Sequence, residues 1–196
     1  MPALIDTSTR LSQRLRDATA AQHEHMHQQM HEAQPFAARE RFAGFVAAQY
    51  VFQRDVEHLF DDAYVQARVP DLAVRGRLAA AQADLGDLAR EVPDDGIATG
   101  QVHGAPALGW LYVSEGSTLG AAFLLKEAEA RLGLSADFGA RNLAAYPEGR
   151  GAVWRRFVAA LDSDALSAED GDRVIVGAHA AFERFAALLG RHLPPA

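Results

Sequence analysis

The sequence predicts an all-α fold made of a single domain. Apolar residues recur every three or four positions through most of the chain, which is the spacing of one buried helix face. No segment shows the strict alternation of apolar and polar residues that indicates a half-buried strand. A length of 196 residues is enough for one domain with a sizeable core. We therefore expect one domain over residues 1–196, with roughly six to eight packed helices and with about residues 1–8 disordered.

Composition and charge exclude several classes of function. Hydrophobic residues make up 49% of the chain and charged residues 23%, as in ordinary soluble proteins. A formal net charge of −7 argues against a nucleic-acid partner. The absence of cysteine excludes disulfides, thiolate metal sites and cysteine nucleophiles. No apolar run reaches the roughly 18 residues that a bilayer span needs, and the amino terminus lacks a signal-peptide pattern. We expect a cytoplasmic protein without a membrane partner.

The first half of the chain predicts three helices. An Asp-Thr-Ser run at residues 6–8 can cap a first helix that extends to about residue 33. A second helix, rich in aromatic residues, should cover about residues 37–67. An Ala- and Leu-rich third helix should cover about residues 72–90, and the loop-forming composition of residues 91–104 ends this half.

The second half predicts three more helices. The longest covers residues 105–132, and the irregular stretch 134–147 after it has room for one helical turn. Residues 148–162 again show a helical apolar face. A capping box, in which Ser167 precedes Asp170 by three positions, opens the last helix.

Two glycines one turn apart, Gly116 and Gly120, interrupt the apolar pattern of helix 105–132. Each interior glycine costs a helix roughly 1 kcal/mol relative to alanine. In return, because glycine has no Cβ atom, the helix can bend at these positions, or its backbone can lie close to a neighbouring group. That group belongs either to a second helix or to a ligand, and taken alone the pattern favours a second helix.

Histidines are concentrated in the first helix, where His23, His27 and His31 lie four residues apart on one face. Such a stripe fits a transition-metal site, but more often it presents polar rings to water. His23 differs from the others because it borders the apolar face beside Met26, so its ring can enter a cavity while its second nitrogen keeps a polar partner. Arg16 lies two turns earlier on nearly the same face, where it can meet a carboxylate.

These features agree with a flat, apolar cofactor that carries carboxylate groups. Such a cofactor needs one axial nitrogen, an opposite face without bulky side chains, and cations at its rim. His23, the backbone at Gly116 and Gly120, and Arg16 with Tyr112 would supply them. The chemistry would then belong mainly to the cofactor.

Two segments resemble the haem oxygenase family, and more closely its bacterial, biliverdin-producing members, including those encoded beside bacteriophytochromes. They are LRDATAAQH (15–23) and GWLYVSEGSTLGAAFLLK (109–126). AQYVFQRDVEHLFDD (48–62) and the last helix extend the resemblance over essentially the whole chain. The resemblance implies a multi-helix fold with haem between a proximal helix and a kinked distal helix.

The resemblance also implies roles on the proximal side. His23 matches the proximal ligand of the haem iron. Arg16, where the family often has lysine, and Tyr112 match positions that contact the haem propionates. The chain departs from the pattern at His27, because many members carry a carboxylate there that can orient the proximal histidine.

On the distal side, Gly116 and Gly120 match the glycines that let the helix lie close to the haem, and Ser117 falls in the polar part of the same region. The family oxidises haem with O₂ and electrons from an external donor, a reductase or a ferredoxin, and the products are biliverdin, CO and ferrous iron. A bacteriophytochrome is a possible receiver of the biliverdin. A haem-binding or haem-carrier protein of the same fold without turnover is the main alternative, and another enzyme on a related helical fold is the next.

Overall fold

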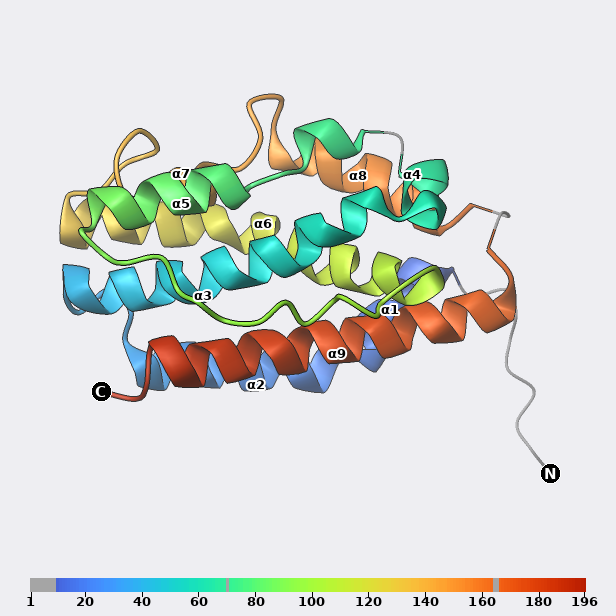
Figure 1. Cartoon of the computed structure of the whole chain (residues 1–196), viewed down its shortest axis with the longest axis horizontal. Coiled ribbons are helices and arrows are strands. Elements are labelled where there is room, and N and C mark those ends of the chain that lie inside the picture. The colour runs from blue at the N-terminus through green and yellow to red at the C-terminus, as the bar shows by residue number, and fades with distance from the viewer. Residues whose placement is uncertain (1–9, 70, 164–165) are drawn as a thin grey trace.

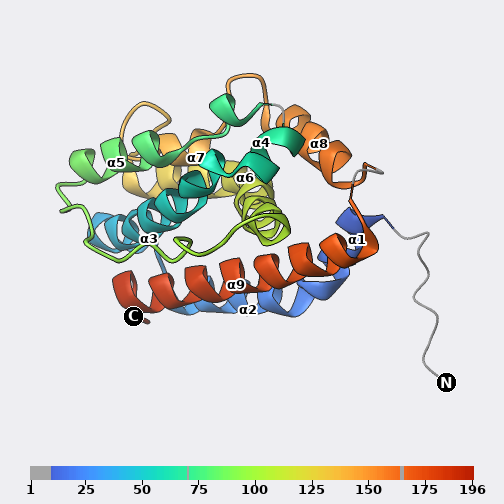
Figure 2. The same ribbon diagram turned by 45° about the vertical axis from the view of Figure 1, so that its right-hand side comes forward.

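Three long helices form the frame of the protein and the remaining helices cover it (Figures 1 and 2). The computed structural model describes residues 10–69, 71–163 and 166–196. In chain order the α-helices are α1 (Leu11–Ala18), α2 (Ala20–Ala33), α3 (Arg39–His58), α4 (Ala63–Arg68), α5 (Leu78–Asp87), α6 (Ala105–Leu132), α7 (Arg141–Ala144), α8 (Arg150–Leu161) and α9 (Ala168–His192). Over these described ranges no extended strand occurs, so the predicted all-α fold is confirmed.

Figure 1 shows how the helices are layered. Helix α9 lies along one side with α2 next to it, α5, α7 and α8 lie on the opposite side, and α3 and α6 run between. The apolar core fills the space among α3, α6 and α9. In the described part of the chain, no helix is long and apolar enough to cross a membrane. The expected cap at residues 6–8 and the expected disorder of residues 1–8 lie outside the described residues.

The first predicted helix is wrong in one respect, because the structure divides it at Thr19 into α1 and α2. The Oγ1 atom of Thr19 donates a hydrogen bond of 2.8 Å to the carbonyl oxygen of Leu15. A threonine side chain bonded back to the preceding turn tends to bend a helix. Thr19 itself is buried, and the break comes one turn before His23.

The second predicted helix is also divided. Helix α3 ends at His58, a 3₁₀ turn follows at Leu59–Asp61, and α4 begins after Asp62. The carboxylate of Asp62 accepts hydrogen bonds from the backbone N–H groups of Tyr64 and Val65, at 2.8 and 3.1 Å, and so caps α4.

The third predicted helix, about 72–90, is shorter than expected. It contains a 3₁₀ turn at Leu72–Val74 and then α5. The carboxylate of Glu57 accepts hydrogen bonds from the backbone N–H groups of Arg77 and Leu78, at 2.6 and 2.5 Å, and this fixes the start of α5. These divisions, together with the one-turn helix α7, give nine α-helices in the described ranges instead of six to eight.

The second half of the chain agrees better with its prediction. Helix α6 has the predicted bounds and ends at Gly133, which adopts the left-handed conformation that glycine accepts easily. Ser167 caps α9 as predicted, because its side chain accepts a 3.0 Å hydrogen bond from the N–H of Asp170, which is the N-cap half of the predicted capping box.

The crossing of α6 and α9 depends on two glycines that the sequence pattern did not single out. A Cβ atom on Gly109 would lie 2.1 Å from the carbonyl oxygen of Val174, and one on Gly177 would lie 2.0 Å from that of Pro106. Both distances are far below van der Waals contact, so only glycine permits the two backbones to approach this closely. This crossing fixes how α6 lies against the rest of the fold.

Candidate functional site

A cavity of about 830 Å³ opens between α1, α2, α3, α6 and α9. This volume lies in the usual range for small-molecule sites. Its walls are mainly apolar and aromatic, and include Met26, Met30, Phe45, Phe52, Leu124, Trp154, Phe182 and Phe185. All six residues singled out from the sequence line it: Arg16, His23, Tyr112, Gly116, Ser117 and Gly120.

Helix α2 presents two histidines to the cavity, His23 and His27. Their ring centroids are 4.6 Å apart and the rings are tilted by 52°. Partial burial lowers the pKa of His23, the neighbouring His27 lowers it further, and Glu24 opposes both effects. The His23 ring is therefore neutral at neutral pH and keeps a nitrogen lone pair for a metal ion.

The expected polar partner of the second His23 nitrogen is not found. Among the described residues the His23 ring has no hydrogen-bond partner, and the residue is exposed rather than buried. His27 occupies the position one turn further on. An imidazole in that place does not supply the negative charge that a carboxylate would.

Arg16 and Tyr112 lie at the same part of the cavity wall. Arg16 is exposed, so its cation is available to a ligand. Burial raises the pKa of the Tyr112 hydroxyl, which Thr19 and then Arg16 partly oppose. Tyr112 is thus a neutral hydrogen-bond donor at physiological pH. Its ring packs against Trp154, with the centroids 5.7 Å apart.

The surface of α6 at Gly116 and Gly120 faces the cavity, and no backbone of another helix approaches it closely. A Cβ on Gly116 would meet only the Trp154 ring, at an ordinary 3.8 Å, and a Cβ on Gly120 would meet nothing within 4 Å. The interpretation of this pair as a helix-packing motif is therefore wrong. The two glycines leave room inside the cavity, beside Leu119 and Phe123, which are 41% and 75% exposed.

A polar group that the sequence analysis missed lies next to Ser117. The Arg77 guanidinium donates hydrogen bonds of 2.8 Å to both the carbonyl oxygen and the hydroxyl of Ser114, and lies 3.5 Å from the Ser117 hydroxyl. Ser114 in turn donates to the side chain of Gln53 at 3.3 Å. Arg77 and Gln53 both line the cavity and are buried.

Two polar atoms of the cavity wall are buried without a partner in the described ranges, Nε of Arg77 and Oε1 of Gln49. Buried polar groups normally have a hydrogen-bond partner, so these atoms are suited to water or to a bound ligand. The only sequence signal for Arg77 was that it forms a pair with Arg75 in a mostly apolar segment.

Arg75, two positions before Arg77, accounts for the direction of the Glu115 side chain. Glu115 is 3% exposed and points away from the cavity. Its carboxylate accepts hydrogen bonds from Arg75 at 2.6 Å and from the Tyr146 hydroxyl at 2.7 Å. Burial raises the pKa of Glu115, while Arg75 and Tyr146 favour its charged form. This buried pair ties the segment that carries Arg77 to helix α6.

Together these features define an all-helical protein with an apolar cavity that has an imidazole, a guanidinium and a phenol at its wall. The residues fit haem: a neutral imidazole lies on one helix, a surface without side chains on another, and a cation with a phenol at the wall. Comparison with known proteins agrees. A family profile described as "Heme oxygenase" matches residues 78–191. The curated protein "Heme oxygenase PigA" of Pseudomonas aeruginosa is 46% identical over 196 residues, which cover 97% of this chain and 98% of that protein.

Solved structures are also similar. A haem oxygenase of Neisseria meningitidis, crystallised with NO and with CO, superposes with a TM-score of 0.88 at 35% identity and covers 96% of this chain and 94% of its own. The haem oxygenase of Leptospira interrogans, at 18% identity, shares the fold with a TM-score of 0.76, over 93% of this chain and 100% of its own. The chain belongs to the haem oxygenase family and is a haem-degrading enzyme, so the family and the activity predicted from the sequence are confirmed.

Proposed function

We propose that the enzyme binds haem in the cavity of about 830 Å³ and opens the ring with O₂ and external electrons to give biliverdin, CO and ferrous iron. Haem is both substrate and cofactor: when bound, it supplies the iron and the conjugated ring on which the oxygen chemistry takes place. The observation that carries the proposal is that one cavity joins His23 to the open face of α6 at Gly116 and Gly120.

His23 is the proposed ligand of the haem iron. Its neutral ring offers a lone pair without losing a proton first, which is the form that binds a metal. An imidazole donates less electron density than a thiolate, and thiolate ligation favours O–O cleavage. The choice of histidine therefore suits a reaction in which the oxygen is delivered to the ring of the substrate.

Arg16 and Tyr112 are the proposed partners of the haem carboxylates. A guanidinium can hold a carboxylate through two parallel hydrogen bonds. The Tyr112 hydroxyl remains protonated because burial raises its pKa, so it can donate to a carboxylate oxygen as well. These contacts would fix the rotation of haem in its plane, and with it the ring position that reacts.

Gly116, Ser117 and Gly120 are the proposed distal residues. The glycines keep the space beside α6 free of side chains, so that a small ligand fits between the helix and the substrate. The Ser117 hydroxyl already donates its proton to the carbonyl oxygen of Ser114 at 2.6 Å. Ser117 is therefore placed to accept a hydrogen bond from water, and the unpaired Nε–H of Arg77 can hold the same water. Water ordered there would carry protons into the cavity.

The remaining components follow from the reaction. The electrons come from a separate reductase or ferredoxin, and a bacteriophytochrome that takes up biliverdin is a proposed receiver of the product. Because such donors act in the cytoplasm, we place the enzyme there. The formal net charge of −7 supports a function without nucleic acid.

The proposal is tested by adding haem, O₂ and a chemical reductant to the purified protein. We expect one haem per chain, followed by a bilin absorption spectrum and one CO per haem consumed. A protein with His23→Ala serves as the control that lacks the proposed ligand. If haem binds but neither bilin nor CO forms, the protein is a haem carrier and the proposal fails.

A further inference from the structure

The five residues from His23 to His27 read H-E-H-M-H and so have the spacing H-E-x-x-H. On a helix this spacing puts the two outer histidines on one face, where both can bind the same metal ion. Here the segment is helical, because it lies inside α2. The rings of His23 and His27 lie beside each other, with centroids 4.6 Å apart, and both line the large cavity.

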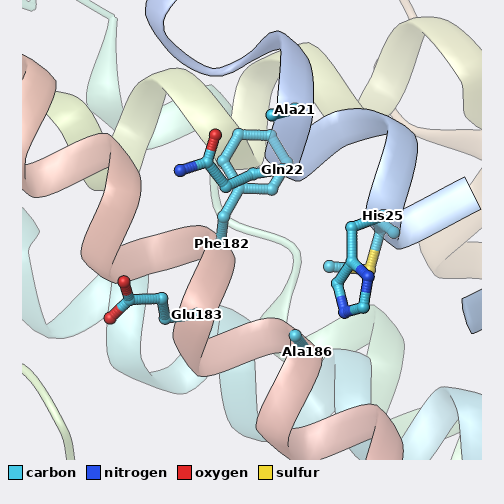
Figure 3. A pocket seen from close by; sticks show the side chains of 7 residues that line it. Ala21, Gln22, His25, Phe182, Glu183 and Ala186 are labelled. Atoms are coloured by element: carbon cyan, nitrogen blue, oxygen red, sulfur yellow. The ribbon is translucent and has the colours of Figure 1, made fainter.

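The other histidines of this helix do not share that position. His25 lies at a second, smaller pocket of about 450 Å³ between α2 and α9, where Figure 3 shows it with Gln22, Phe182 and Glu183. His31 is one turn beyond His27 and does not line the large cavity. The helix therefore directs one pair of imidazoles, His23 and His27, into the cavity.

We propose that His23 and His27 together form a binding site for a divalent first-row transition metal ion when no haem is bound. Imidazole is a good ligand for Zn²⁺, Fe²⁺, Co²⁺ and Ni²⁺. In the described ranges no group of three or more His, Asp or Glu side chains is placed to hold a metal. Two imidazoles supply two ligands, and water supplies the rest, so the ion can exchange readily.

This site has a use in haem degradation, and that part of the inference rests on the proposed function. When the ring is opened, ferrous iron loses its four pyrrole nitrogens while it is still beside His23. His27 is near enough to provide a second imidazole as water fills the other positions. Only metal–ligand bonds change, and the iron stays ferrous. The pair would hold the iron until it leaves the cavity.

The metal site is tested on the haem-free protein by calorimetric titration with Zn²⁺. We expect one ion per chain. His27→Ala should weaken Zn²⁺ binding by at least about tenfold. Even loss of a residue that only hydrogen-bonds to a metal ligand typically lowers metal affinity about 10- to 100-fold, and His27 would be a ligand itself. His25→Ala is the matched control, since it removes one histidine of the same helix from outside the cavity and should leave the affinity unchanged. Far-UV circular dichroism verifies that each variant is folded.

Three outcomes would overturn the site: no binding by the folded protein, equal binding by the His27→Ala variant, or loss of binding in the His25→Ala or His31→Ala variant. A competition arm sharpens the test. Bound Zn²⁺ should raise the haem concentration needed for half-saturation, because His23 cannot serve both, and an unchanged haem titration would contradict the assignment of His23 to the site.

The role in iron release is measured separately, in a single turnover with a coloured ferrous chelator. The His27→Ala variant should transfer iron to the chelator faster than the His25→Ala variant does, and equal rates would remove this role. If no variant produces bilin while Zn²⁺ still binds through His23 and His27, the proposed function fails and the metal site stands.

Discussion

Helix α6 uses glycine in two regions for opposite purposes. Near its start, Gly109 faces the backbone of α9, and an added Cβ would lie 2.1 Å from the carbonyl oxygen of Val174. Two turns later, Gly116 and Gly120 face the cavity, where an added Cβ would lie 3.8 Å from a Trp154 ring atom or would meet nothing within 4 Å. In the first region glycine lets two helices touch, and in the second it keeps a space open.

The difference shows that glycine spacing alone does not reveal what the glycine is for. Gly116 and Gly120 have the spacing expected of a helix-packing motif, yet no backbone of another helix lies within 4 Å of the Cβ that either would carry. The close helix contact is made instead by single glycines on two helices, Gly109 on α6 and Gly177 on α9. The two regions therefore predict different results when a methyl group is added.

The largest effect is expected at the helix crossing. Gly109→Ala should lower the free energy of unfolding by about 3 kcal/mol, at the upper end of the usual cost of overpacking, because the added methyl collides with backbone that cannot rotate away. Denaturant unfolding measures this change. Gly86→Ala is the control: Gly86 is an exposed glycine inside α5 with nothing within 4 Å of its would-be Cβ, and the substitution should not destabilise the fold. A Gly109→Ala variant as stable as the parent would contradict the comparison.

At the same cavity, His23→Ala should remove the axial ligand and abolish the normal haem spectrum. The protein should stay folded, because the His23 side chain is exposed. The absorption spectrum of the haem complex is the measurement. The matched variant is His27→Ala, which removes the neighbouring ring and should keep the His23-ligated spectrum. The opposite pattern, with the spectrum lost only in His27→Ala, would show that the ligand assignment is wrong.

A large side chain at the second glycine region should separate binding from turnover. Gly120→Leu fills cavity space beside α6, so we expect bilin formation to fall much more than haem uptake. Haem titration and the rate of bilin formation, measured on the same preparation, provide the two quantities. Equal loss of both would show that the space beside Gly120 is needed for haem to bind and has no separate effect on turnover.

The smallest effect is expected when a methyl group is added at the cavity glycine Gly120. Gly120→Ala in the haem-free protein should raise the free energy of unfolding by up to about 1 kcal/mol, because alanine is the better helix former and no atom lies within 4 Å of the new methyl. The same unfolding experiment as for Gly109→Ala applies. A loss of stability instead would mean that an added methyl group is not tolerated at Gly120 either, as at Gly109.

Local signals in the sequence were enough to predict the second half of the fold. The glycine after Leu132 and the N-cap at Ser167 mark the ends of long helices through interactions within a few residues. The divisions of the first half were not predictable in this way. Glu57 fixes the start of α5 from a different helix, about twenty positions away in the chain.

In the candidate site too, some residues were predictable from the sequence and others were not. His23, Arg16 and Tyr112 were found from their periodic positions and from the resemblance to a family, and all lie at one cavity. Arg77 was missed because its meaning depends on Ser114 and Ser117, which approach it only in the folded protein.

By itself, the sequence determined the helical class, the position of the longest helices and the family, because these depend on short-range periodicity, on caps and on a contiguous motif. The tertiary structure decided the rest: that Gly109 is the packing glycine of α6, that Gly116 and Gly120 face a cavity, that Glu115 turns away toward Arg75, and that the side of α2 with His23 and His27 faces the same cavity. Each of these depends on which distant segments pack around a residue in the folded protein, and the local sequence does not determine that packing.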